Sequence, residues 1–155
     1  MYSKILVPLD GSRLAEAAIG HALELAHGNG AEIVLVNAAQ DSLAAVPEAR
    51  INVSSLQVYA GAIRGMMYLQ EVANRIRRCG TRVQCDVLEG EPAPAILSCA
   101  RKENVDVIVM GTHRRTGLSR MFKGSVAETV ASEANRPVIL VKEGVEAGEE
   151  LAKAA

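Results

Sequence analysis

Five short strand-like segments alternate along the chain with stretches of helical periodicity, and this alternation limits the possible folds more than any other feature. Four are apolar runs typical of strands buried within a sheet, at residues 4–9, 32–37, 105–110 and 138–141, and the other, at residues 82–88, alternates between apolar and polar residues. Each intervening stretch carries apolar residues at helical spacing. A regular β-α-β order predicts an α/β domain with a five-stranded parallel sheet, right-handed crossovers and helices on both faces.

Turn and capping residues set the bounds of the predicted helices. Ser12 is placed to cap the first helix, which ends in the Gly-Asn-Gly segment at 28–30. The second helix is predicted from about Ser55 to Cys79, after a long loop at 40–54 that could gate a pocket or be passive. Its predicted apolar face consists of Tyr59, Ile63, Met66, Leu69, Ala73 and Ile76. The third helix follows Pro92, and the fourth spans 126–134.

The character of each run predicts its place in the sheet. Residues 82–88 alternate between apolar and polar, which indicates a strand near one edge. Residues 105–110 are apolar apart from Asp106, which favours a central strand, and residues 138–141 are expected at an edge. Pro8 must lie near the end of the first strand, because proline cannot donate to a ladder.

Composition narrows the classes of partner. The net charge is −1, and the chain has one Phe, three Tyr and no Trp, so neither a basic field nor aromatic platforms favour nucleic-acid binding. No apolar run reaches transmembrane length, and no signal peptide is evident. The three cysteines have neither metal-ligand spacing nor an even count, so we expect no metal site and a cytoplasmic location.

A glycine-rich segment late in the chain points to phosphate. The apolar run ends in Gly111, a basic loop follows, and Gly124-Ser125 opens a helix whose N-terminal N–H groups suit an anion. The segment has neither a Walker lysine nor a G-x-G-x-x-G fingerprint. Ligands of parallel sheets bind where the strand order reverses, so neighbouring first and fourth strands would bring Asp10 and Gly111 together across a crevice.

Four stretches, ILVPLDGS, VDVIVMGTH, GSVAETV and RPVILVK, closely resemble the universal stress protein family. The resemblance covers residues 2–142. It implies a Rossmann-like sheet, similar to the adenine nucleotide alpha hydrolases, with strand order 3-2-1-4-5. We accordingly predict one domain at 1–143 and a flexible C-terminal tail at 144–155.

The nucleotide-binding branch of that family has a signature of Gly, two residues, Gly, nine residues, Gly and then Ser or Thr. Gly111, Gly124 and Ser125 match it, but Arg114 stands where the second glycine belongs. An arginine there could block a triphosphate pocket or clamp phosphate through its guanidinium. Charge alone adds Arg115 and Lys123 as candidate phosphate contacts.

The resemblance implies roles for individual residues of an adenine-nucleotide site. Pro8, Leu9 and Asp10 would lie by the adenosine, Asn37 or Ala38 would contact adenine through the backbone, and Met110 would line the base or ribose. Gly111, Gly124, Ser125 and Val126 would hold phosphate. Three of these residues have plainer alternatives: Asp10 as a turn former, Ser125 as a helix cap and Met110 as core.

The expected function is that of a universal stress protein that binds ATP, with or without Mg²⁺, as a regulatory ligand in stress response rather than as an enzyme substrate. One alternative is a nucleotide-free dimer that acts through contacts with an unidentified protein, because Arg114 replaces a motif glycine. A second is a slow nucleotide hydrolase. Family members commonly dimerise through the last strand, which here predicts a homodimer through Val138, Ile139, Leu140 and Val141.

Overall fold

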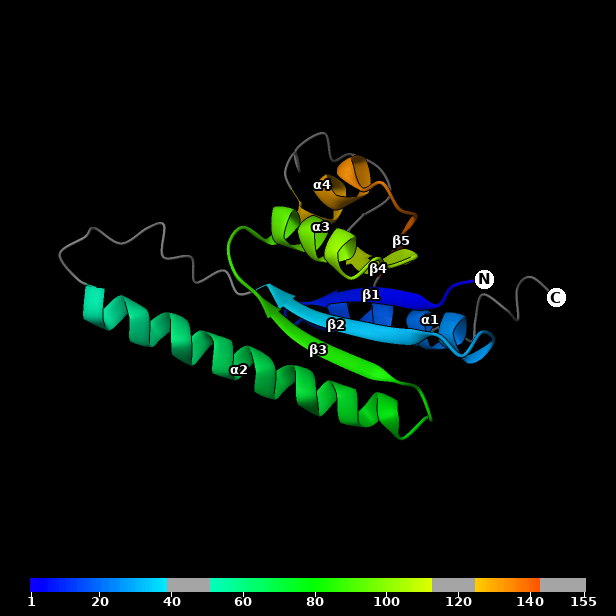
Figure 1. Cartoon of the computed structure of the whole chain (residues 1–155), viewed down its shortest axis with the longest axis horizontal. Coiled ribbons are helices and arrows are strands. Elements are labelled where there is room, and N and C mark those ends of the chain that lie inside the picture. The colour runs from blue at the N-terminus through cyan, green and yellow to red at the C-terminus, as the bar shows by residue number, and fades with distance from the viewer. Residues whose placement is uncertain (39–50, 113–124, 143–155) are drawn as a thin grey trace.

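The computed structural model describes residues 1–38, 51–112 and 125–142, apart from the side chains of residues 51–56. Its elements follow the order β1 (Lys4–Leu9), α1 (Arg13–His27), β2 (Glu32–Ala38), α2 (Ile51–Arg77), β3 (Val83–Leu88), α3 (Pro92–Lys102), β4 (Val107–Thr112), α4 (Val126–Glu133) and β5 (Val138–Lys142) (Figure 1). All strand pairs are parallel, and the order β3-β2-β1-β4-β5 confirms the prediction.

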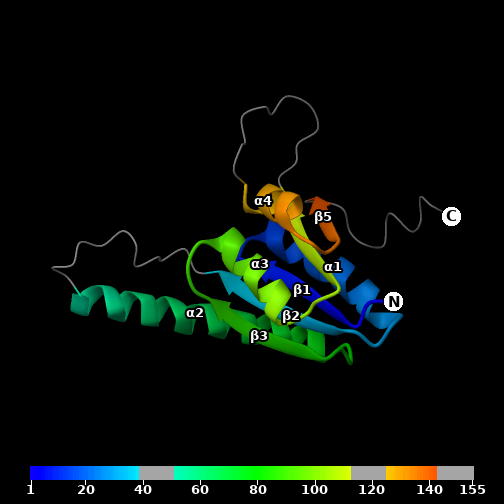
Figure 2. The ribbon, with the colours of Figure 1, turned by 45° about the horizontal axis from the view of Figure 1, so that its top comes forward.

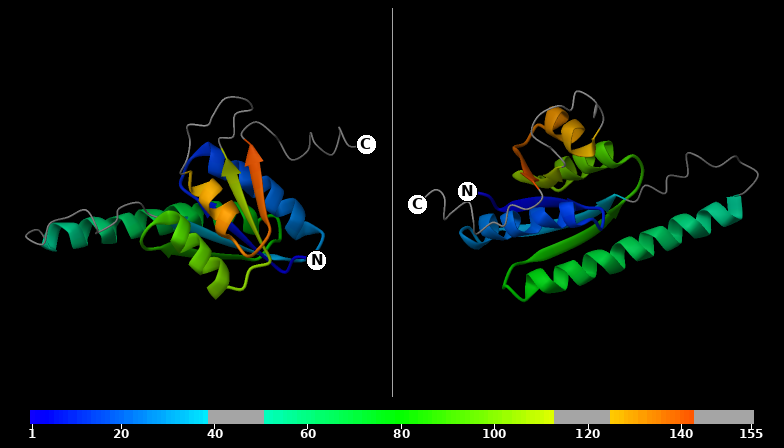
Figure 3. Two further views of the ribbon diagram at one scale, coloured as in Figure 1. Left: turned by 90° about the horizontal axis from the view of Figure 1, so that it is seen from above. Right: turned by 180° about the vertical axis from the view of Figure 1, so that it is seen from behind.

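The sheet separates two apolar cores. Alternate residues of β1 show the division: Ile5, Val7 and Leu9 pack with α1 and α2, whereas Leu6 packs with α3 and α4. Figure 2 shows α3 and α4 lying together over the sheet, and Figure 3 shows the same layers from above and from behind. Because each face is covered by a pair of helices, the inner strands β2, β1 and β4 are largely buried, as their apolar runs predicted, whereas the edge strands β3 and β5 are mostly half-buried.

The predicted capping residues and strand positions are largely confirmed. Ser12 Oγ accepts the Ala15 N–H at 3.1 Å, and Pro8 is the fifth of six residues in β1. β3 and β5 are the edge strands. β4 lies inside the sheet, between β1 and β5, as its apolar sequence predicted. It begins at residue 107 rather than 105, because the Val105 N–H is bonded to the Ala100 carbonyl at the end of α3.

The first half of α2 departs most from the sequence prediction. The helix begins at Ile51, so residues 51–54 of the predicted loop are helical, and it ends at Arg77 rather than Cys79. The rest of that loop, and the predicted tail at 144–155, lie outside the described residues. Tyr59 and Ile63, which the periodicity places on the buried face, are 68% and 45% exposed.

The exposure of these side chains follows from the lengths of the packed elements. A helix of 27 residues is about 40 Å long, whereas a six-residue strand such as β3 spans about 20 Å. The first half of α2 therefore extends past the strands, as Figures 1 and 3 show. Leu69, Ala73 and Ile76, farther along the helix, lie over the sheet and are buried as predicted.

Candidate functional site

We call the place where β1 and β4 stop pairing, at the carboxyl end of the sheet, the crevice. β1 pairs with β2 up to Leu9, which lies opposite Asn37. Among the described residues, the pairing of β1 with β4 is confined to Ile5 and Leu6. The carboxyl half of β4 pairs with β5 instead. Pro8 fits this arrangement because it has no N–H to donate, and the two strands part at the point where the strand order reverses.

On one face of the sheet, α1 packs tightly against β4 at Gly111. A Cβ atom at this position would overlap the carbonyl oxygen of Leu14 and would lie 3.1 Å from the Cα of Ala15. The first turn of α1 therefore passes directly against the strand. Sequence reasoning assigned Gly111 to phosphate approach, and the structure shows a second requirement for glycine that only the fold reveals.

Asp10 lies at the surface, directly after β1, in the turn that leads into α1. Its Oδ1 accepts the Ser12 N–H at 2.8 Å, and Gly11 between them has a φ of +86°. The turn-forming role considered for Asp10 is thus present in the structure. Because Asp10 directly follows β1, its exposed carboxylate lies at the same end of the sheet as the crevice.

Three other candidates share the face covered by α3 and α4. Met110 is 6% exposed and belongs to the core that includes Leu6 and Ala127 of α4. Alternation along β1 and β2 places Pro8 and Ala38 on the same face. Pro8 is buried and Ala38 is half-buried. These small and apolar side chains form one wall at the carboxyl end of the strands.

The N-terminus of α4 is the candidate anion-binding element. Ser125 is its cap, and Ser125 Oγ accepts the Glu128 N–H at 3.2 Å. Half-buried Val126 begins the helix, whose first-turn N–H groups carry partial positive charge. Four other predicted site residues, Arg114, Gly124, Arg115 and Lys123, lie outside the described residues.

A polar cluster that sequence reasoning missed joins α1 to α2 near Asp10. The Tyr68 hydroxyl donates to Glu16 at 2.9 Å, and Arg75 pairs with the other oxygen of Glu16 at 3.1 Å. Burial, followed by the hydrogen bond to Glu16, raises the pKa of the Tyr68 phenol well above its ordinary value, and the charge of Asp10 adds to the shift. Tyr68 therefore remains a hydrogen-bond donor. Helical spacing could not have paired residues so far apart in the chain.

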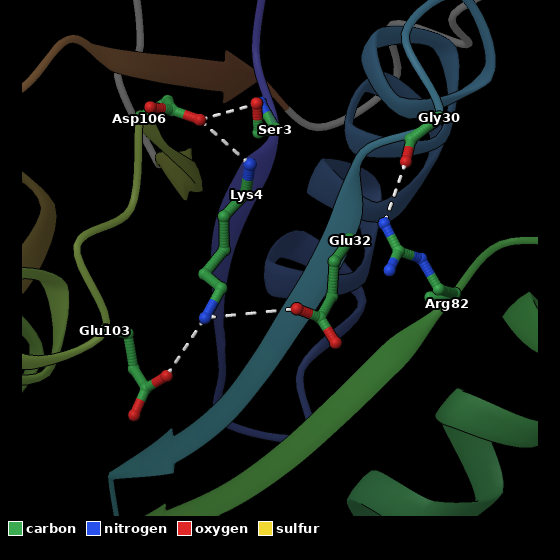
Figure 4. A network of polar contacts seen from close by, with 7 residues as sticks. All are labelled: Ser3, Lys4, Gly30, Glu32, Arg82, Glu103 and Asp106. Atoms are coloured by element: carbon green, nitrogen blue, oxygen red, sulfur yellow. Dashed lines mark hydrogen bonds and ion pairs between the residues drawn. The ribbon is translucent and has the colours of Figure 1, made fainter.

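A second polar network lies at the opposite, amino-terminal end of the strands (Figure 4). Lys4 Nζ is 3.2 Å from Glu103 Oε2 and 3.9 Å from Glu32 Oε2. Asp106 Oδ2 accepts the backbone N–H groups of Ser3 and Lys4 at 2.6 and 2.9 Å, and these bonds lower the pKa of Asp106. The network ties the start of β1 to β2 and to the segment that leads into β4, at the end away from the crevice.

The sequence profile of the universal stress protein family matches residues 1–142, which span every strand and helix described above. The chain belongs to the universal stress protein family. A universal stress protein of Methanocaldococcus jannaschii is 34% identical over 145 residues, covering 92% of this chain and 83% of the relative. A solved structure of a second protein from that organism is 27% identical, with a TM-score of 0.79, covering 94% and 99% of the two chains.

The universal stress protein of Archaeoglobus fulgidus has been solved in complex with dAMP. It is 24% identical to this chain, with a TM-score of 0.63, and the match covers 91% of this chain and 98% of that one. This likeness shows a shared fold. Within the described parts of the chain, no helix is long and apolar enough to cross a membrane, and no group of three or more His, Cys, Asp or Glu could hold a metal ion.

Proposed function

We propose that this universal stress protein binds an adenine nucleotide, ATP with or without Mg²⁺, in the crevice between β1 and β4, and that the nucleotide acts as a regulatory ligand in stress response. The observation that carries the proposal is the end of β1–β4 pairing at Leu6, beside the capped N-terminus of α4. An open strand pair and a helix N-terminus at the same end of the sheet combine room for a ligand with an affinity for anions.

The surrounding side chains fit the parts of a nucleotide. The wall of Pro8, Ala38 and Met110 suits a flat, apolar base, and the Ser125 hydroxyl with the first N–H groups of α4 suits phosphate. The exposed carboxylate of Asp10 could serve a ribose hydroxyl or a Mg²⁺ ion. The dAMP complex of the Archaeoglobus relative supports the choice of an adenine nucleotide.

We propose binding rather than turnover. The Asp10 carboxylate is already bonded to the Ser12 N–H, and the nearby Glu16 carboxylate is bonded to Tyr68 and Arg75, so neither of these described acidic groups is left unpaired to activate water. A bound nucleotide would then act by favouring one conformation or one partner. Release of phosphate or pyrophosphate at a steady rate in a turnover assay would favour the slow hydrolase instead.

The proposal includes a homodimer through β5 in a reducing, cytoplasmic setting. β5 is an edge strand, and Val138, Ile139 and Leu140 are only half-buried in the single chain. Pairing with β5 of a second copy would cover both edges. The three cysteines are free thiols, which suits a reducing compartment. Size-exclusion chromatography with light scattering measures the mass of the protein in solution, and the mass of a monomer would contradict the proposed homodimer.

Calorimetric titration with ATP and Mg²⁺, on the unaltered protein and on Arg114→Gly, tests the nucleotide site. Saturable binding by the unaltered protein supports the proposal and shows that Arg114 is compatible with the ligand. Binding only after glycine is restored would favour the alternative function, a nucleotide-free dimer that works through protein contacts. The Arg114 departure is the specific observation that keeps this alternative in view.

A further inference from the structure

We propose that Asn37 is a positioning residue for the crevice, whose side-chain amide holds the backbone that carries Asp10, and that Gly65 of α2 provides the space for that amide. This inference rests on the proposed nucleotide site. It assigns a role to a side chain for which the sequence predicted only a backbone contact, and to a glycine on a helix that contributes no residue to the predicted site.

Asn37 is a polar interruption of an apolar row. Ile33 and Leu35 precede it on the same face of β2 and are fully buried against α1 and α2. Its neighbours across the sheet are Leu9 on β1 and Val87 on β3. An aliphatic side chain would continue this row without loss, whereas a half-buried amide costs free energy unless it is hydrogen-bonded. The partners of the amide therefore indicate its purpose.

The amide donates to the end of β1. Asn37 Nδ2 lies 2.9 Å from the carbonyl oxygen of Leu9, the residue directly before Asp10. On the other side, Asp10 Oδ1 accepts the Ser12 N–H at 2.8 Å. The turn from β1 into α1 is thus held at both ends, by Asn37 before Asp10 and by Ser12 after it. Removing the first bond frees the peptide that sets the position of the Asp10 carboxylate.

Gly65 is matched to the amide. A Cβ atom at this position would lie 2.7 Å from Asn37 Oδ1 and 3.4 Å from Val87 Cγ2. Glycine inside a helix is less stable than alanine, so its presence here requires a local reason, and the close approach of Asn37 supplies one. Because the amide is the mobile end of a side chain, an alanine at position 65 would displace it while leaving the backbone in place.

The side chain acts at a distance from the ligand. Asn37 faces α1 and α2, whereas the proposed wall for the base, Pro8, Ala38 and Met110, lies on the opposite face. Asn37 therefore acts on binding through Leu9 and Asp10 rather than by touching the nucleotide. The Asn37 side chain should therefore contribute to the affinity for the nucleoside part of the ligand, and this contribution should be the same whatever the number of phosphates.

Two variants test the tether by different routes. Asn37→Leu replaces the amide with an aliphatic group of similar size, and Gly65→Ala displaces it. We expect both to weaken ATP binding about threefold to tenfold, the equivalent of one hydrogen bond, and to weaken ADP binding by the same factor. The melting temperature of each variant should stay the same or rise, because the leucine at position 37 continues an apolar row and the alanine at position 65 favours the helix. Gln70→Ala, at an exposed position of the same helix, is the matched control.

The double variant separates positioning from general loosening. If both substitutions act through the same amide, the double variant loses no more affinity than the stronger single variant. Additive losses that track the melting temperature would overturn the inference, as would unchanged ATP affinity in either single variant. Failure of the unaltered protein to bind ATP would overturn the proposed function, and this inference with it.

Discussion

Replacing Gly111 with alanine should destabilise the whole domain. The added Cβ would overlap the Leu14 carbonyl oxygen and crowd the Ala15 Cα, both of which belong to the backbone of α1. No rotamer change relieves a contact between two backbones, so α1 must move away from β4. That helix buries Ala15, Ala18, Ala22 and Ala26 against the sheet, and a shift loosens this packing.

The size of the effect follows from two opposing contributions. Overpacking of a core costs about 1–3 kcal/mol, and the backbone nature of this contact favours the upper part of that range. Alanine restricts the unfolded chain more than glycine does, and this difference stabilises the folded state by about 0.4–1 kcal/mol. We expect a net loss of about 2 kcal/mol, which corresponds to about 4–8 °C in melting temperature for a domain of this size.

Urea unfolding followed by circular dichroism measures this loss, with Gly28→Ala as the matched control. Gly28 ends α1 with a φ of −74°, and a Cβ atom added there would meet no other atom within 4 Å, so alanine should be tolerated. Equal stability of Gly111→Ala and the unaltered protein would refute the packing argument. The glycine of the signature would then be needed for a ligand alone.

Two further substitutions test the ends of the sheet. Asp106 accepts two backbone N–H groups, which lower its pKa, so its contribution is present above about pH 3.9 and is lost as the pH falls through the folded-state value. Asp106→Asn should reduce the free energy of unfolding by about 1 kcal/mol or less at pH 6, and the difference should shrink toward pH 3; a constant difference across that range would contradict this. Ser125→Ala removes the cap of α4 and should cost about 1 kcal/mol, whereas Ser132→Ala, at an exposed position of the same helix, should stay within about 0.5 kcal/mol in the same unfolding assay. Equal losses from the two serine variants would argue against the cap.

Much of the frame could be predicted because its signals are local. Ser12 and Ser125 cap helices through bonds to N–H groups three residues away, and such chemistry can be recognised in a short stretch of sequence. The alternation of apolar runs with helical periods is also local, and it determined the fold class. The strand order came from the family resemblance, since periodicity alone does not say which strands are neighbours.

The sequence could not show which residues of a helix would pack against the sheet. Helical spacing grouped Tyr59 with Leu69, although only the second half of α2 has strands beneath it. Nor could spacing show that Gly65 approaches Asn37, because that contact depends on how α2 crosses the sheet. Such requirements arise from the packing of distant segments, and they become visible only when the elements are assembled.

Two residues near the crevice matter because of the chemical groups that they lack. Pro8 offers no N–H where β1 and β4 part, and Gly111 has no side chain where α1 crosses β4. The contacts that hold Asp10 and Ser125 are made by Ser12 and Glu128, residues of the described frame. Because these contacts are made between described residues, we expect Arg114→Gly to change nucleotide affinity while leaving the free energy of unfolding nearly unchanged. Equal changes in the free energy of nucleotide binding and in the free energy of unfolding would mean that Arg114 also stabilises the fold.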